Sequence, residues 1–460
     1  MIVRRFYCYN FTSFRTRGGG ESACQPLRFP MRETLDKLVI RRPRRHLRRH
    51  AIRGQRVLMY ALGGIVVGVV AIVMAQLADL AQALYQRIND LSPNAHWWLT
   101  PLGFGAITLV TQRYLPSAAG SGIPQVIASL HTSTLEARAR LVSLVSALGK
   151  IALMSLGFVI GASIGREGPS IQVGAALMHQ IRWFNRKRSK DLIIAGAGAG
   201  VAAAFSTPLA GVLFAIEELN RTIASRTSGL LIGAILMAGF TSLAVVGDYS
   251  YFGTTHHAVV WSSVWLPALV IGGVGGILGG AFTLVLVHGP DRLKRLLPLP
   301  PATGSVVFAV VCGLLVAALS SASTDSINGT GYAVAYSVIQ DDHLISPWFL
   351  VNKFCATALS SMSGIPGGIF SPSLAIGAGL GVDVHLWFPS LPVSIMAVLG
   401  MAAFLSGVVQ APLTAVVIVL EMTHDHALVV PLMACSLTAN WVAQRLSAEG
   451  VYHRLARRYL

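Results

Sequence analysis

Two glycine-rich elements of the same design lie 203 residues apart in this chain. They are Gly165-Arg166-Glu167-Gly168-Pro169-Ser170 and Gly368-Ile369-Phe370-Ser371-Pro372-Ser373. Three further pairs keep nearly the same register: Lys150 with Lys353, residues 208–217 with 412–421 at an offset of 204, and Gly120-Ser121-Gly122 with Gly329-Thr330-Gly331 at 209. Residues 115–220 and 325–425 are therefore predicted to be two copies of one unit.

The composition places these copies in a membrane. Hydrophobic residues make up 53% of the chain and charged residues 12%, with a mean hydropathy of +0.62, whereas ordinary soluble domains carry about 25% charged residues. Apolar runs that approach or reach the spanning length of roughly 17–25 residues lie at 57–82, 99–112, 141–164, 228–246, 264–287, 303–321 and 394–420. We expect an all-α polytopic membrane protein.

Several apolar segments are too short to span and begin just after Gly/Pro clusters, namely 121–130, 168–181 and 369–381. They are predicted to be helices that enter the membrane and stop partway. Irregular backbone is tolerated at that depth only where protein or a water-filled cavity satisfies it. Interrupted helices at corresponding positions of two repeats are typical of transporters whose site lies near the bilayer midplane.

The net charge of +17 is concentrated in arginines between positions 41 and 56, directly before the first apolar run. The excess of basic residues in cytoplasmic loops explains this cluster better than a nucleic-acid arm. We therefore expect cytoplasmic N- and C-termini, the lipid bilayer as a partner and no nucleic acid. Translation from Met31 is an alternative start, which would leave residues 1–30 untranslated or without structure.

We expect no enzyme, cofactor or metal site. The five cysteines, at 8, 24, 312, 355 and 435, have no metal or redox spacing. Residues 161–165 fit a G-x-S-x-G nucleophile pattern but follow no strand. The alternating glycines Gly196, Gly198 and Gly200 are better explained by close helix packing than by a dinucleotide loop.

The element around Ser121 suits an anion. Gly120 and Gly122 allow the backbone to approach a ligand, and Pro124 favours a helix that starts there. The Ser121 hydroxyl would then lie at a helix N-terminus, which carries partial positive charge and unpaired amides. The alternative is a serine that only caps its own helix.

Glu167 lies between Gly165-Arg166 and Gly168-Pro169, at the start of a short helix. A carboxylate in a membrane segment is costly and therefore usually functional or paired. It can act as a gate that occupies an anion site and leaves when protonated, or it can simply complement the helix dipole. In the second copy Phe370 replaces it, so the backbone amides of Ile369 and Phe370, next to Gly368, become the expected anion ligands.

Glu217 and Glu218 end an apolar helix, and adjacent positions point in different directions. Glu217 has a counterpart in Glu421, so we expect it to be structural. Glu218 matches Met422 and is acidic in one copy only, which favours a role that the two halves do not share.

Taken together, the G-S-G-I-P, G-R-E-G-P and G-I-F-S-P motifs and a late tyrosine resemble the chloride channel and chloride/proton exchanger family over roughly residues 57–458. The resemblance implies about eighteen membrane helices in two inverted repeats, and a homodimer with one pore per subunit. It implies four parts, which are a basic segment 1–56, repeats 57–250 and 251–445, and a C-terminal helix 446–460 with the pore tyrosine.

The resemblance also implies roles for single residues. Chloride would be bound by the hydroxyls of Ser121 and Tyr452 and the amides of Ile369 and Phe370. Glu167 would be the external gate and proton-transfer residue, and Glu218 the internal proton-transfer residue. The other motif positions would support the pore: Gly120, Gly122, Pro124, Gly165, Arg166, Gly168, Pro169 and Gly368. Serine at position 121 is typical of chloride-preferring members.

Three functions are consistent with this pattern. The first is chloride/proton antiport, which needs protonatable Glu167 and Glu218 and which the acid at position 218 favours. The second is a passive, voltage- or pH-gated chloride channel, which needs only Glu167. A more remote third is a cation-coupled carrier of an organic anion, which needs a roomier pocket. We expect a bacterial inner membrane as the location.

Overall fold

The computed structural model describes residues 31–181, 188–219, 228–247, 252–253, 263–296, 300–341 and 344–460. Residues 1–30, which precede the alternative start at Met31, lie outside the described residues. Contacts within the chain divide it into two compact units, Met1–Gly54 and Gln55–Leu460.

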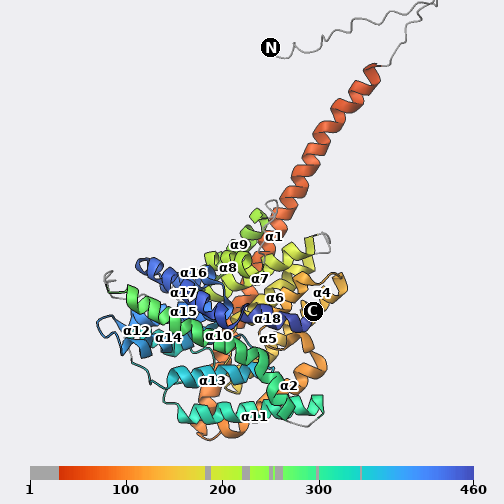
Figure 1. Cartoon of the computed structure of the whole chain (residues 1–460). Coiled ribbons are helices and arrows are strands. Elements are labelled where there is room, and N and C mark those ends of the chain that lie inside the picture. The colour runs from red at the N-terminus through yellow and green to blue at the C-terminus, as the bar shows by residue number, and fades with distance from the viewer. Residues whose placement is uncertain are drawn as a thin grey trace, which may run out of the picture. The chain divides into compact units, whose positions relative to one another are not determined.

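The described residues form helices and no β-strand (Figure 1). The α-helices of the first half are α1 (Met31–Leu91), α2 (His96–Tyr114), α3 (Ile123–His131), α4 (Leu135–Leu141), α5 (Leu144–Val159), α6 (Glu167–Gln180), α7 (Ser189–Phe205), α8 (Pro208–Phe214) and α9 (Ser228–Val246). Those of the second half are α10 (Trp265–Leu296), α11 (Pro301–Ala322), α12 (Tyr332–Asp341), α13 (Phe349–Met362), α14 (Phe370–His385), α15 (Val393–Val409), α16 (Pro412–Thr423), α17 (Val429–Leu446) and α18 (Val451–Ala456). The all-α fold is confirmed.

Six helical segments of the described chain are long and apolar enough to cross a bilayer: Gly54–Leu91, Leu135–Val159, Gly229–Val246, Trp265–Arg292, Thr303–Ala322 and His426–Tyr459. The chain is therefore an integral membrane protein. The expected number of about eighteen membrane helices stays a prediction. The short helices predicted after the Gly/Pro clusters are present as α3, α6 and α14.

The predicted single span at 394–420 is wrong, because the chain breaks between α15 and α16. Gln410 adopts the left-handed conformation (φ 59°) and Pro412 starts the next helix. Proline lacks the amide that would continue a helix, so the two segments are separate. The equivalent break in the first copy has Ser206 at φ 55° and Pro208. Similarly, the run 141–164 is helical only to Val159.

The two copies repeat the same helix packing. In the first copy α6 packs on α7, and a Cβ added at Gly174 would lie 2.3 Å from the Gly196 carbonyl oxygen. In the second copy α14 packs on α15, and a Cβ at Gly377 would lie 2.4 Å from the Gly400 oxygen. Only glycine allows backbones so close, which confirms close packing as the reason for the glycine at position 196.

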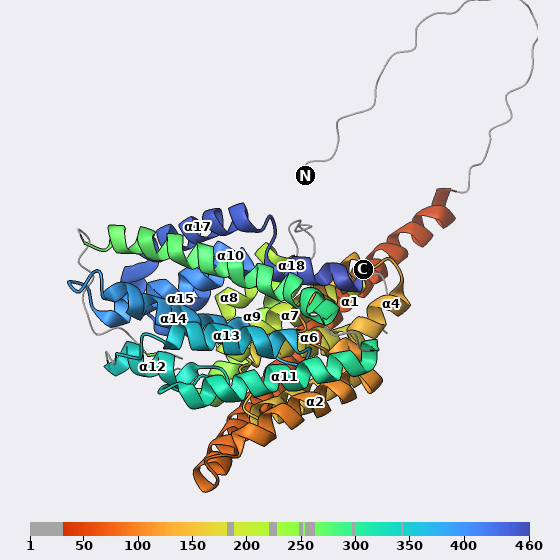
Figure 2. The same ribbon diagram turned by 60° about the horizontal axis from the view of Figure 1, so that its bottom comes forward.

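The helices of the Gln55–Leu460 unit form successive layers (Figure 2). α2 packs on α11, α11 on α13, α13 on α14, and α14 on α15. α10 and α17 then pack on each other and on α15. The short interrupted helices α6 and α14 lie inside this stack, where nearly every side chain is buried.

Two glutamates join the copies reciprocally at the starts of α8 and α16. The Glu217 carboxylate accepts hydrogen bonds from the amides of Leu413 (3.2 Å) and Thr414 (2.7 Å) and from the Thr414 hydroxyl (2.7 Å). The Glu421 carboxylate accepts from the amides of Leu209 (3.1 Å) and Ala210 (2.7 Å). Each acid thus caps the helix of the other copy, and the structural role expected for Glu217 is confirmed.

We expect Glu217→Ala and Glu421→Ala each to lower the free energy of unfolding by about 1–3 kcal/mol, because each leaves helix-start amides without a charged acceptor. Thermal unfolding of the detergent-solubilised protein measures this. Glu449→Ala is the control, since it removes only a surface ion pair with Arg457, which is worth less than about 1 kcal/mol. Equal melting temperatures for all three variants would contradict the capping role.

Candidate functional site

The glycine-rich elements of both copies meet through backbone hydrogen bonds. The amide of Gly165 donates to the Gly368 carbonyl and the amide of Gly368 donates to the Gly165 carbonyl, both at 2.7 Å. The Gly367 amide donates to the Gly120 carbonyl at 3.1 Å. Three segments that are far apart in the sequence are thereby joined at one place.

Ser121 lies at this junction, just before α3. Its side chain is buried, and its hydroxyl has no hydrogen-bond partner. Gly120 (φ 61°) and Gly122 (φ 99°) flank it in left-handed conformations that favour glycine, and Pro124 lies in the first turn of α3. The serine therefore does not cap its own helix, so its hydroxyl is available to a ligand.

Gly168 lies directly against Ser121. A Cβ added at Gly168 would lie 2.4 Å from Ser121 Oγ and 2.8 Å from the Ser121 carbonyl oxygen. Pro169, the next residue, lies in the first turn of α6, and its Cδ would be 3.3 Å from a Cβ added at Gly368. Ser121 can therefore take this position only because residue 168 is a glycine and has no side chain.

Glu167 is the first residue of α6 and is fully buried. Neither of its carboxylate oxygens has a hydrogen-bond partner, although the Ser371 hydroxyl and amide, at the start of α14, lie close enough to act on them. Arg166 Nε lies 4.0 Å from Glu167 Oε1. The carboxylate is therefore held by the packing around it and not by hydrogen bonds.

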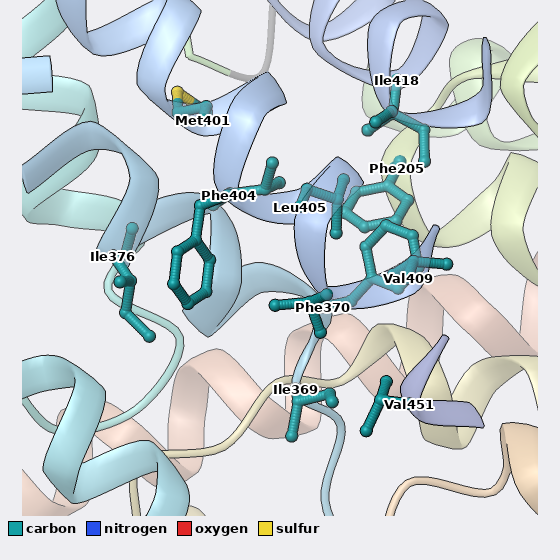
Figure 3. Packing of buried hydrophobic residues seen from close by; sticks show 14 of the residues in the cluster. Phe205, Ile369, Phe370, Ile376, Met401, Phe404, Leu405, Val409, Ile418 and Val451 are labelled. Atoms are coloured by element: carbon teal, nitrogen blue, oxygen red, sulfur yellow. The ribbon is translucent and has the colours of Figure 1, made fainter. Parts of the chain in front are cut away.

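Ile369 and Phe370 begin α14, where the first amides of a helix have no partner within the helix. The Phe370 ring packs on Phe205, with ring centroids 5.5 Å apart (Figure 3). It also stacks on Tyr452, at 6.4 Å between centroids and 9° between planes. The aromatic contacts hold the start of α14 in position.

Tyr452 is fully buried in α18, and its hydroxyl has no hydrogen-bond partner. α18 packs on α3, the helix that begins just after Ser121, and the Tyr452 ring stacks on Phe370. The structure therefore brings together four side chains that the sequence analysis singled out.

Glu218 lies in a π-turn, Ala215–Leu219, and is only 5% exposed. Its Oε1 lies 3.9 Å from Nδ1 of His453, the residue after Tyr452. Glu217, its neighbour, reaches Thr414 instead, so the two acids do point to different partners. The π-turn was not predicted; such turns are frequent at functional sites.

Two cavities approach this site. A cavity of about 190 Å³ is lined by Ser121 and Ile369 and by Arg458 and Tyr459 near the C-terminus. A second, of about 290 Å³, is lined by Arg166, Thr330 and residues late in α1, including Asp79. Glu167 lines neither cavity, although its neighbour Arg166 lines the second.

Two buried lysines support the site, and the sequence analysis assigned them no role. Lys150 Nζ donates to the Gly120 carbonyl at 2.9 Å, and Lys353 Nζ donates to the carbonyls of Ile327 (2.8 Å) and Gly329 (2.9 Å). Both lysines are fully buried, and both hold the first glycine of a matching element. A lysine in an apolar helix was the signal for a buried partner.

Residues 102–444 match the family model described as voltage gated chloride channel. The chain is 31% identical over 433 residues to the H(+)/Cl(-) exchange transporter ClcA of Klebsiella pneumoniae, which covers 88% of each chain. It is also 31% identical over 376 residues to the ClcA of Vibrio parahaemolyticus, covering 76% of this chain and 77% of that one.

Two solved structures have a similar fold. A slow cyanobacterial Cl-/H+ antiporter superposes with a TM-score of 0.75 at 27% identity, over 88% of this chain and 97% of that one. A CLC-type fluoride/proton antiporter superposes with a TM-score of 0.72 at 23% identity, over 87% of this chain and 97% of that one.

We expect Gly168→Ala to weaken chloride binding by about tenfold, because a methyl group here displaces Ser121, and such overpacking costs about 1–3 kcal/mol. Calorimetric titration of the solubilised protein with chloride measures the change. Gly233→Ala in α9 is the matched control, since its added Cβ would meet nothing within 4 Å. Unchanged affinity in Gly168→Ala would contradict a role of Ser121 in binding.

Proposed function

The chain belongs to the voltage-gated chloride channel family, and from this premise we propose that it exchanges chloride for protons across the membrane. One observation carries the proposal, which is that two buried acids lie beside the two unpaired hydroxyls of Ser121 and Tyr452. Glu167 precedes Gly168, which lies against Ser121, and Glu218 lies 3.9 Å from His453, the residue after Tyr452. A passive anion path has no need for the second acid, whereas an exchanger needs a proton-accepting group on each side of the anion site.

The proposed chloride site uses the hydroxyls of Ser121 and Tyr452 and the amides of Ile369 and Phe370. Both hydroxyls are buried without a partner, which is costly unless a ligand accepts from them. The starts of α3, α6 and α14 are at or next to this junction. Their partial positive charges suit a dehydrated anion.

Glu167 is proposed to couple the two ions. In its ionised form the carboxylate competes with chloride for the same positive helix starts. When Glu167 takes up a proton, its neutral side chain is no longer attracted to the helix starts and leaves the anion site. Chloride can then enter the site, and Glu167 carries the proton. Glu218 is proposed to exchange protons on the other side of Tyr452, from its position near His453.

The proposed orientation follows from charge. The arginines before the first apolar run favour a cytoplasmic N-terminus, so the cavity near Arg458 and Tyr459 would face the cytoplasm and the cavity near Asp79 the outside. We further propose a bacterial inner membrane, two inverted repeats at 57–250 and 251–445, and a homodimer with one pore per subunit. The resemblance of the motifs to the family supports the repeats and the homodimer, and the bacterial sources of the two ClcA relatives support the bacterial membrane.

We expect purified protein in liposomes to move protons uphill when it is given a chloride gradient, because exchange couples the two fluxes. Simultaneous recording with chloride and pH electrodes tests this. Chloride flux without coupled proton movement would instead indicate a passive channel, and proton-coupled uptake of an organic anion without chloride movement would indicate the third candidate.

We expect Glu167→Gln and Glu218→Gln each to abolish proton movement while chloride still passes, because glutamine resembles the protonated acid and carries no proton. The same two-electrode assay measures both ions. Glu136→Gln is the control, since Glu136 is an exposed acid on α4, and its coupling should equal that of the wild type. Proton coupling that survives either substitution removes that acid from the mechanism.

A further inference from the structure

Three charged side chains lie in a row: Asp79, Arg166 and Glu167. They lead from the cavity of about 290 Å³ to the buried Glu167. Arg166 Nη1 lies 2.7 Å from Asp79 Oδ1 and also donates to the Ala75 carbonyl at 3.0 Å. Arg166 Nε lies 4.0 Å from Glu167 Oε1. One guanidinium therefore faces two carboxylates, one from α1 and one from α6.

Burial increases along this line. The side chain of Asp79 is 72% exposed, that of Arg166 is 10% exposed, and that of Glu167 is fully buried. Asp79 and Arg166 both line the cavity of about 290 Å³. A charge at the aqueous surface is thus connected to the gate through a single intervening side chain.

Two hydrogen bonds connect the Arg166 guanidinium to α1. They go to Asp79 and to the Ala75 carbonyl, whereas the distance from Arg166 Nε to Glu167 Oε1 is beyond hydrogen-bond range. Without the Asp79 charge, the positive charge of Arg166 would act on Glu167 with less compensation. A nearby cation favours the ionised form of a carboxyl group, so the gate would be harder to protonate.

Asp79 is the acid that lines this cavity in the described part of the chain. The remaining lining residues are Gln82, Ala83, Gln86, Thr330, Tyr332 and Ala333, of which only the tyrosine titrates. The buried Lys353 of α13 is bonded to the backbone carbonyls of Ile327 and Gly329, just before Thr330. Among these described groups, Asp79 is thus the one whose negative charge faces Arg166.

We propose that Asp79 is a positioning residue for the gate: it holds Arg166 away from Glu167 and thereby sets the pH at which Glu167 opens the anion path. This inference rests on the proposed function, because it assumes that Glu167 gates the flux. It adds a residue on α1, outside all of the glycine-rich motifs, to the machinery of exchange.

Asp79→Asn tests the proposal through the pH profile of chloride flux in liposomes, with pH equal on both sides. We expect the acid-activated part of the profile to move to lower pH by about one unit, the lower end of the effect of one opposite charge. Asp79→Glu should restore the wild-type profile. Asp90→Asn, an exposed acid on the same helix, should leave it unchanged. A wild-type profile in Asp79→Asn would overturn the proposal.

The double variant Asp79→Asn/Glu167→Gln separates a gating effect from a change at the cavity entrance. If Asp79 acts through Glu167, its substitution has no further effect on chloride flux once position 167 cannot ionise. An equal loss of flux in both backgrounds would overturn the positioning role. The proposed function fails on different evidence, namely uncoupled wild-type flux or proton coupling that survives Glu167→Gln.

Discussion

The paired hydrogen bonds between Gly165 and Gly368 join the two copies where their helices are interrupted. Backbone groups inside a bilayer cannot be satisfied by lipid, so an interrupted helix is stable only if other protein groups supply the bonds. Each copy supplies them to the other here, at 2.7 Å in both directions. The starts of α6 and α14 are thereby fixed next to each other, on the two sides of the proposed anion site.

Charged side chains support the backbone in both copies. Glu217 and Glu421 each cap a helix of the opposite copy. Lys150 and Lys353 each bind the first glycine of the matching element within their own copy. Charged groups thus satisfy backbone groups at two pairs of equivalent places. The carboxylate of Glu167 is different, because neither of its oxygens has a hydrogen-bond partner, which agrees with the gating role that we propose for it.

The asymmetry between the copies lies in their side chains. Phe370 occupies the position equivalent to Glu167 and packs on Phe205 and Tyr452, so the second copy is held rigid where the first copy carries an acid. Glu218 likewise has an apolar counterpart in Met422, which is fully buried. A duplicated scaffold with unequal acids provides a direction for proton movement that two identical halves could not.

Hydropathy, motif spacing and turn residues were enough to predict the membrane class, the duplication, the short helices after Gly/Pro clusters and the candidate residues at the site. These are local properties, since hydropathy, the missing amide of proline and the free φ of glycine act within a few residues. The break between α15 and α16 was missed because the apolar run continues through it, although Pro412 is a local signal for a new helix start.

Which elements meet depends on the tertiary fold: Asp79 with Arg166, 87 residues later, Glu217 with Thr414, and Lys150 with Gly120. A charged residue in an apolar segment indicates that the residue has a partner. The identity of the partner cannot be predicted from the local sequence, because the contact depends on how distant helices pack.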